Sequence, residues 1–344
     1  MFRAKLKYAA YLAFMALAAC GEKKLPVHAD AVKPVLVTEQ TGFDTDDPAI
    51  WINAADTAHS LIVGTDKDTD GGLYTFDLAG KVQKKVALKR PNNVDITYGF
   101  MFNGKPVDIA VVTERETNTI RIFSLPGLEP LDNGGISVFD GETERGPMGI
   151  ALYKRPSDSA VFAIVGRKSG PAQGYLWQYR LEDGNNGSIK ATVVRKFGAY
   201  SGKKEIEAIA VDQQLGYVYY SDETVGIRKY NANPGNDQEL NFFGKTGFAS
   251  DHEGISIYPL SDTTGYILVS NQQNNTFVVF KREGDNAQVA EVPVSTDESD
   301  GSEVTAVPLS PKFPNGLFVA MSNGKVFHYY DWRDIQQRIT AQQK

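Results

Sequence analysis

The chain repeats one pattern of paired strands about every 50 residues. In each unit a short apolar strand follows a charged cluster and a second apolar strand ends in another, as in Asp46-Asp47 before residues 49–51 and Asp66 after residues 61–63. The equivalent positions are Ala49, Asp95, Ile150, Ala208, Gly254 and Thr305. All-β units at this period are typical of propellers. We therefore expect an all-β fold, a six-bladed β-propeller with four-stranded antiparallel blades around a central channel.

The charged clusters are expected to meet on one face of this disc. Consecutive strands of a blade run antiparallel, so the start of the first and the end of the second lie on the same side. Most cluster residues are carboxylates, which repel one another unless cations lie among them, and Ca²⁺ prefers oxygen ligands. The interleaved Arg and Lys suit phosphate. We interpret this face as a site where several calcium ions bind a multiply phosphorylated anion; simple solvation of the loops is the alternative.

One acidic loop allows two interpretations. Residues 66–71 have the oxygen spacing of a calcium loop, with Asp77 at the twelfth position. No flanking helix is expected, so the loop is not an EF-hand. The alternative is a hairpin turn in which Gly71 and its neighbours supply positive φ angles.

The N-terminus has the features of an export signal. Arg3, Lys5 and Lys7 precede an apolar stretch over residues 8–17, and Leu17-Ala18-Ala19-Cys20 matches a bacterial lipoprotein signal. We expect residues 1–20 to be the signal segment with Cys20 lipidated, residues 21–34 a polar tether and residues 35–340 the propeller, in which residues 35–37 form a strand that closes the ring. The protein is then exported and lipid-anchored in the bacterial outer membrane, on its periplasmic or surface side.

Composition removes several classes of function. The formal net charge of the 344-residue chain is −6, and loss of the basic leader makes it more negative, which argues against a nucleic-acid partner. Cys20 is the single cysteine, so the mature domain has neither a disulfide nor a thiolate metal site. We expect a monomer.

Several motifs together resemble those of the β-propeller phytases. They are residues 44–51, residues 90–95, Glu114-Arg115 with residues 118–120, residues 251–254 and the acidic stretch 297–303. The resemblance runs from about residue 35 to about residue 335, in matching order. It implies a six-bladed, calcium-dependent phosphatase that acts on phytate (inositol hexakisphosphate) and on lower inositol phosphates.

The resemblance also implies roles for individual residues. Positions that hold calcium in the family are matched by Asp46, Glu207, Glu253, Asp297, Asp300 and either Asp222 or Glu223. The clustered acids Asp47, Asp251 and Glu303 complete our candidate metal set. Lys67, Arg115 and Arg167 match phosphate-binding positions, and Lys168 is a further candidate. We expect catalysis to depend on Glu207, Asp222, Glu223 and Glu253. The chain departs from the family at Asp68, where a basic residue is usual, and at Met148, near which a tyrosine is expected.

The mechanism follows partly from missing nucleophiles. None of the four histidines, His28, His59, His252 and His328, has the Arg-His-Gly setting of a phosphohistidine enzyme, and no cysteine remains for a phosphocysteine. Attack by a metal-activated water is left, with Arg and Lys clamping phosphate. Because cations recur on several blades, we expect a second subsite for a neighbouring phosphate. The alternatives are a calcium-dependent lactonase or esterase and a non-catalytic binding propeller.

Overall fold

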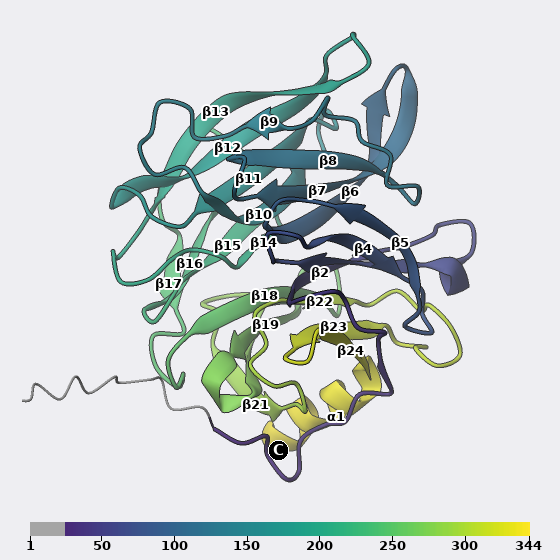
Figure 1. Ribbon diagram of the computed structural model, residues 1–344. Coiled ribbons are helices and arrows are strands. Elements are labelled where there is room, and N and C mark those ends of the chain that lie inside the picture. Colours follow the sequence, from purple (N-terminus) through teal and green to yellow (C-terminus); the bar gives the residue numbers. More distant parts are fainter. Residues whose placement is uncertain (1–24) are drawn as a thin grey trace, which may run out of the picture.

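The computed structural model describes residues 25–344, which form six four-stranded antiparallel sheets around a central channel (Figure 1). The predicted six-bladed propeller is confirmed. The colours of Figure 1 pass from blade to blade, so that sheets adjacent in sequence are adjacent in space. Residues 1–24, with the predicted signal segment, Cys20 and the first part of the tether, lie outside the described residues.

The strands follow one another along the chain in blades of four. Blade 1 contains β2 (Thr45–Trp51), β3 (Leu61–Asp66), β4 (Gly72–Phe76) and β5 (Val82–Ala87). Blade 2 contains β6 (Pro91–Phe102), β7 (Lys105–Glu114), β8 (Thr119–Leu125) and β9 (Ile136–Ser137), and blade 3 contains β10 (Pro147–Lys154), β11 (Val161–Arg167), β12 (Gln173–Asp183) and β13 (Ile189–Ala199). Blade 4 contains β14 (Ile209–Asp212), β15 (Tyr217–Asp222), β16 (Gly226–Asn231) and β17 (Asn241–Phe243), and blade 5 contains β18 (His252–Pro259), β19 (Gly265–Asn271), β20 (Thr276–Lys281) and β21 (Gln288–Pro293).

Blade 6 closes the ring by combining both ends of the domain. It contains β22 (Ser302–Thr305), β23 (Leu317–Ser322), β24 (Val326–Asp331) and the N-terminal β1 (Leu36–Val37). Leu36 pairs with Tyr329 and Val37 with His328 in antiparallel register, which confirms the predicted closing strand. The N-terminal strand is the fourth strand of the last blade, so the two ends of the domain pair in one sheet and the ring is closed.

The helices are short. They are the 3₁₀ helices η1 (Thr57–His59) and η2 (Gln272–Asn274) and the α-helix α1 (Trp332–Gln342). Asp331 caps α1 by accepting a hydrogen bond from the backbone N–H of Arg333, and Trp332 stacks on Tyr258 of blade 5 with ring centroids 3.7 Å apart. Among residues 25–344, no helix has both the length and the apolar character needed to cross a membrane.

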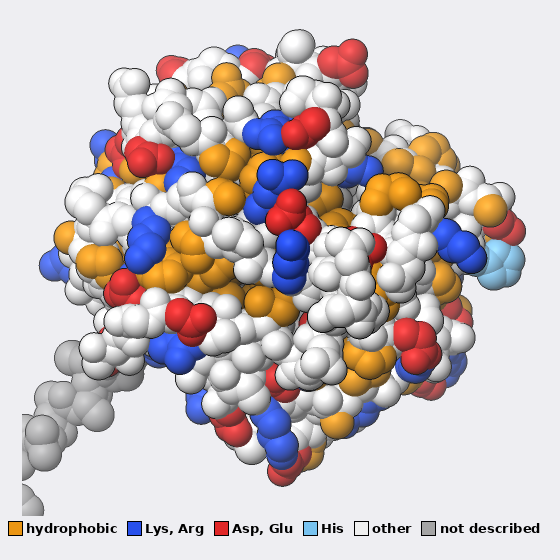
Figure 2. All heavy atoms as spheres, turned by 90° about the horizontal axis from the view of Figure 1, so that it is seen from above, with side chains coloured by type: hydrophobic (Ala, Val, Ile, Leu, Met, Phe, Trp, Pro, Cys, Tyr) orange, Lys and Arg blue, Asp and Glu red, His pale blue; other side chains and the backbone are white. Residues whose placement is uncertain are grey.

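Apolar side chains pack between neighbouring blades rather than in one centre. One cluster joins Val111 of blade 2 to Leu152 and Val165 of blade 3, and another joins Val63 of blade 1 to Val112 of blade 2. Because the core lies between the sheets, residues at the strand ends are not part of it and can be polar. The side of the molecule seen in Figure 2 shows acidic and basic side chains interspersed, without a broad field of one sign.

The loop with calcium-like spacing is a hairpin turn. It joins β3 to β4, with Asp66 paired to Gly72 and the N–H of Gly71 bonded to the carbonyl of Asp68 at 3.0 Å. Asp77 follows the other end of β4, so it cannot close a ligand loop with these residues. A Cβ on Gly71 would lie 1.9 Å from the carbonyl oxygen of Asp66, which explains the glycine. The hairpin turn is therefore confirmed, but the positive φ angles expected there are wrong, because neither Gly71 nor Gly72 has a positive φ.

Candidate metal and anion site

A β-bulge recurs near the start of the innermost strand of several blades. In β2 the register with β3 shifts between Thr45 and Pro48, so Asp46 and Asp47 together face one residue of β3. Strands β6, β10 and β18 shift register at the corresponding place. An extra residue turns successive side chains in different directions. Asp46 consequently contacts Lys67, whereas Asp47 lines the central channel.

A polar cavity of about 480 Å³, here called the cleft, opens beside these strand ends. Its lining comes from blades 1 to 4 and includes Asp44, Lys67, Asp68, Thr69, Arg90, Asn92, Arg115, Met148, Lys168, Glu205 and Glu207. Asp68 and Met148, the two positions at which the sequence departs from the family pattern, both lie in this lining. The departures therefore bear on ligand contact rather than on the frame of the fold.

Buried carboxylate oxygens without hydrogen-bond partners gather beside the cleft. They are Oδ2 of Asp46, both oxygens of Glu223 and Oε2 of Glu253. Glu205, Glu207 and Glu223 each place an oxygen within 4.8 Å of the others, and the Lys204 ammonium lies 3.6 Å from Glu223. Leaving several buried carboxylates unsatisfied is costly, so such a group calls for a ligand that supplies positive charge.

Burial and mutual repulsion raise the pKa values of these carboxyls. The pKa of Glu207 rises to about 8, first through burial and then through the charge of Asp46. The pKa of Glu223 rises to about 9 through burial and through Glu207 and Glu205, and that of Glu253 lies well above its ordinary value through burial and Glu223. Perturbed acids concentrated at a cleft mark a candidate functional site.

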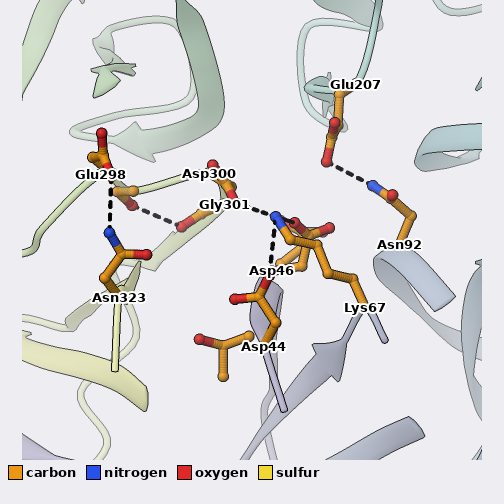
Figure 3. A network of polar contacts seen from close by, with 12 residues as sticks. Asp44, Asp46, Lys67, Asn92, Glu207, Glu298, Asp300, Gly301 and Asn323 are labelled. Atoms are coloured by element: carbon orange, nitrogen blue, oxygen red, sulfur yellow. Dashed lines mark hydrogen bonds and ion pairs between the residues drawn. The ribbon is translucent and has the colours of Figure 1, made fainter. Parts of the chain in front are cut away.

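Lys67 connects two of the blades at this site. Figure 3 shows its ammonium between the carboxylates of Asp46 and Asp300, with Asp44 nearby. The distance from Nζ to Oδ1 of Asp46 is 2.9 Å, a shorter contact joins Nζ to Oδ2 of Asp300, and Asp44 Oδ2 is 4.0 Å away. Burial lowers the pKa of Lys67, but Asp46 and Asp300 outweigh it and raise the pKa above its usual value. The ammonium is therefore held charged between them.

The structure separates the roles of Asp222 and Glu223. The carboxylate of Asp222 accepts hydrogen bonds from the Oγ of Ser201 at 2.7 Å and from Nε and Nη2 of Arg228 at 3.0 and 2.9 Å. Asp222 is thus committed to contacts within the protein, whereas the oxygens of Glu223 are not hydrogen-bonded. Of this pair, which the sequence left open, the geometry favours Glu223 as the ligand.

Asp251 and Asp297 have protein partners of their own. Oδ2 of Asp251 accepts from Lys204 and from the Nε2 of Gln273, each at 2.6 Å. Oδ2 of Asp297 accepts from the Nδ2 of Asn323 at 3.3 Å. Both acids are therefore engaged in contacts within the protein.

Asp47 and Glu303 lie in the channel, apart from the cleft. With Asp95 they line a second cavity, of about 310 Å³, between the innermost strands. Oδ2 of Asp47 accepts from the N–H of Val94 in blade 2, and Oδ2 of Asp95 accepts from the N–H of Leu152 in blade 3. These two carboxylates therefore join neighbouring blades. Burial raises the pKa of Glu303 to about 8.

The predicted phosphate-binding cations occupy different environments. Arg115 and Lys168 line the cleft, where Nη1 of Arg115 donates to Oδ1 of Asn92 at 3.0 Å and Nζ of Lys168 lies 2.6 Å from Glu205. Arg167 is 1% exposed and lies over the ring of Phe139 and beside Glu142, outside the cleft lining. Lys168 and Arg115 are therefore the better placed for an anion in the cleft.

Sequence reasoning missed two contributors. Glu205 is not among the candidate ligands named from the sequence, although it precedes Glu207 by two residues and extended backbone places such pairs on one side. Asn92 connects the two halves of the site, since its Nδ2 donates to Oε1 of Glu207 at 2.6 Å while its Oδ1 accepts from Arg115. Its place in the motif of residues 90–95 was the available signal.

The donor set fits hard divalent cations. Oxygen ligands converge from blades 1, 4, 5 and 6, several are buried without partners, and the described residues offer no thiolate there. Flexible coordination by six to eight oxygens is the preference of Ca²⁺. The cations along the cleft add an anion-binding side to the same site.

Comparison with known proteins points to one family. The family model described as Phytase matches residues 4–336. The chain is 31% identical over 319 residues to the 3-phytase of Bacillus subtilis (strain 168), covering 86% of this chain and 81% of that protein. Among solved structures, a luciferin-regenerating enzyme superposes with a TM-score of 0.54 at 14% identity, covering 86% of this chain and 95% of that one, a likeness of fold alone.

Proposed function

This chain belongs to the phytase family and is a phytate-hydrolysing phosphatase, and we propose that it works as a calcium-dependent enzyme whose ions are held by the carboxylates of the cleft. The observation that carries this proposal is the group of buried oxygens without hydrogen bonds on Asp46, Glu223 and Glu253 beside a cleft lined with cations. Neither a lactonase nor a non-catalytic binding propeller would need basic side chains such as Arg115 and Lys168 in this cleft.

The carboxylates that would hold the ions form two groups. Glu205, Glu207 and Glu223 form one group within 4.8 Å, and Asp46 and Asp300 form another around Lys67. Calcium bound there supplies positive charge that lowers the pKa of an attacking water and neutralises phosphate oxygens. Asn92 keeps the two sides of the site in register because it bonds Glu207 and Arg115 together.

The cations of the cleft bind and orient the substrate. Arg115 and Lys168 flank the opening, and their charges offset that of a phosphate and of its transition state. Arg115 offers a planar fork to two phosphate oxygens, and Lys168, 55% exposed, offers a mobile point charge. A second phosphate of the same inositol ring can then be bound while the first is hydrolysed.

The test is release of inorganic phosphate from phytate by the purified protein. We expect full activity with added Ca²⁺, loss of activity with a chelator, and recovery when Ca²⁺ returns. Glu223→Gln should lose activity and bound calcium together, whereas Asp70→Asn, which changes an exposed acid paired with Lys89, should retain both. Undiminished phosphate release after exhaustive chelation would contradict calcium dependence.

We further propose that the protein is exported and lipid-anchored at Cys20. Support comes from the sequence, in which the residues before Cys20 match a lipoprotein signal. The first described residues lie near the site, since the N–H of Leu25 donates to the carbonyl of Gln273, whose side chain holds Asp251. Cys20→Ser should move the protein from the membrane fraction to the soluble fraction; unchanged membrane association would refute anchoring at this residue.

A further inference from the structure

Lys67 occupies a position between two acids of the candidate metal site. Its ammonium lies 2.9 Å from Asp46 and in close contact with Asp300, and it draws these residues of blades 1 and 6 together (Figure 3). The side chain of Asp46 is fully buried and that of Asp300 is 13% exposed, so water screens this pairing weakly. Lys67 thus acts as a cation built into the chain.

The same two carboxylates are assigned to calcium by the proposed function. Oδ1 of Asp46 is occupied by Lys67, while Oδ2 has no hydrogen-bond partner. Oδ2 of Asp300 is likewise occupied by Lys67, and its Oδ1 accepts from Gln272. An ammonium and a divalent cation cannot both occupy the space between these oxygens, because their like charges repel at such distances.

We propose that Lys67 competes with calcium for Asp46 and Asp300, and that calcium binding there releases the ammonium to bind a substrate phosphate. This inference rests on the proposed function and deepens it. Lys67 lies in the cleft lining, so the released ammonium has the anion-binding space beside it. The residue therefore couples metal binding to substrate binding.

The local structure permits this exchange. The backbone of Lys67 is fixed, since its N–H donates to the carbonyl of Asp44 at 2.8 Å. The side chain is 27% exposed, and its ammonium lies at the end of a flexible four-carbon chain. Rotation of that side chain moves the charge without moving the fold. In the absence of calcium, the ammonium offsets the repulsion between Asp46 and Asp300. When calcium is bound, the calcium ion offsets that repulsion instead.

Two consequences follow. Calcium must displace an existing ion pair, so its affinity for this position is lower than the carboxylates alone would give. A phosphate that binds the released ammonium makes the displacement easier, so phosphate should tighten calcium binding, and calcium should tighten phosphate binding by the same factor.

The experiment measures calcium binding, not turnover. Titration calorimetry with calcium chloride compares the wild-type protein with Lys67→Met, which keeps an unbranched side chain one atom shorter and removes its charge. We expect the calcium dissociation constant of this site to fall by about tenfold or more, as loss of a competing ion pair predicts. Lys67→Arg should stay within a few-fold of wild type, and Lys89→Met, which removes the same charge from an exposed pair with Asp70, should leave the constant unchanged.

A second arm separates competition from a general change of charge. Inorganic phosphate is added to the calcium titration of each protein. Wild type should show tighter calcium binding with phosphate, and Lys67→Met should lose most of that effect while binding calcium more tightly on its own. If Lys67→Met does not fold, as judged by circular dichroism, Lys67→Gln replaces it in both arms.

The outcomes are distinct. Weaker or unchanged calcium binding in Lys67→Met overturns the inference, because Lys67 then organises the acids or is indifferent to the metal. Calcium binding by wild type with no effect of Lys67→Met leaves the proposed function standing and removes the competition. If neither protein binds calcium, both proposals fail together.

Discussion

Replacing Glu223 by glutamine should stabilise the protein at pH 8 in chelator and destabilise it relative to wild type in calcium. Glu223 is 1% exposed, neither of its oxygens has a hydrogen-bond partner, and its pKa is raised from 4.5 to about 9. A carboxyl whose pKa is higher in the folded than in the unfolded state contributes to stability at low pH. This contribution is fully present below the unfolded-state pKa and is lost as pH rises through the folded-state pKa. Wild type in chelator should therefore lose stability between about pH 4.5 and about pH 9.

The magnitude can be worked from these values. At pH 8 the folded state must keep Glu223 protonated or bury its charge, which costs about 2–4 kcal/mol relative to the unfolded chain. The amide of glutamine avoids that cost but is itself buried without partners, a penalty of about 1–2 kcal/mol. The net gain of Glu223→Gln, taken from the mid-points of these two ranges, is then about 1.5 kcal/mol, which raises the Tm of a domain of this size by about 2 °C. At pH 5 only the amide penalty remains, so the variant should be the less stable protein.

The assay is thermal unfolding followed by circular dichroism at pH 5 and pH 8, with EDTA and with calcium chloride. Calcium at a free concentration one hundred times its dissociation constant should stabilise wild type by about 2.7 kcal/mol and so raise its Tm. It should raise the Tm of the variant much less. Asp70→Asn serves as the control for loss of an exposed acid. A variant that is less stable than wild type in EDTA at pH 8, or that gains as much from calcium, would refute this account of Glu223.

Further outcomes are expected at the same site and away from it. Calcium affinity, measured by calorimetry, should increase from pH 6 to pH 9 with release of protons, because the pKa of Glu207 is about 8 and that of Glu253 lies well above its ordinary value; a flat profile would contradict this. Arg115→Gln should retain bound calcium by metal analysis yet raise the KM for phytate about tenfold, since it removes a charged phosphate contact; loss of metal would assign it a different role. Phytate should be hydrolysed with a higher kcat/KM than an inositol monophosphate, and equal values would remove the second subsite. Asp212→Ala should cost about 3–5 kcal/mol in unfolding experiments while leaving calcium binding intact, because it strands the buried Arg282, and a small loss would show that Arg282 finds other partners.

The fold was readable from the sequence because its signal is periodic. The recurring strand pairs predicted six blades, and the short apolar segment at residues 35–37 predicted the closing strand β1. The direction of individual side chains was not readable. Asp46 and Asp47 are adjacent, yet the bulge of β2 sends one toward Lys67 and the other into the channel, and a bulge leaves no residue-type signature in this chain.

Competition between partners was equally hidden from the sequence. Asp222 and Glu223 are neighbours with the same charge, but Arg228, which lies six residues further along, occupies the first and leaves the second. Of Arg167 and Lys168, the first is buried over Phe139 and the second lines the cleft. Strand alternation places one of each pair on each side of the sheet, but which side bears on the site depends on tertiary contacts.

The crowded, buried acids of this site oppose stability when they are ionised and no further cation lies among them. Burial of Glu207, Glu223 and Glu253 raises their pKa values, so under the proposed calcium dependence protons and calcium would compete for the same oxygens. At Asp46 and Asp300 the competitor in the proposed exchange is the ammonium of Lys67, and its release would create a phosphate contact. If that exchange takes place, calcium binding adds a phosphate contact to those of Arg115 and Lys168, so calcium and phosphate should be found to bind together.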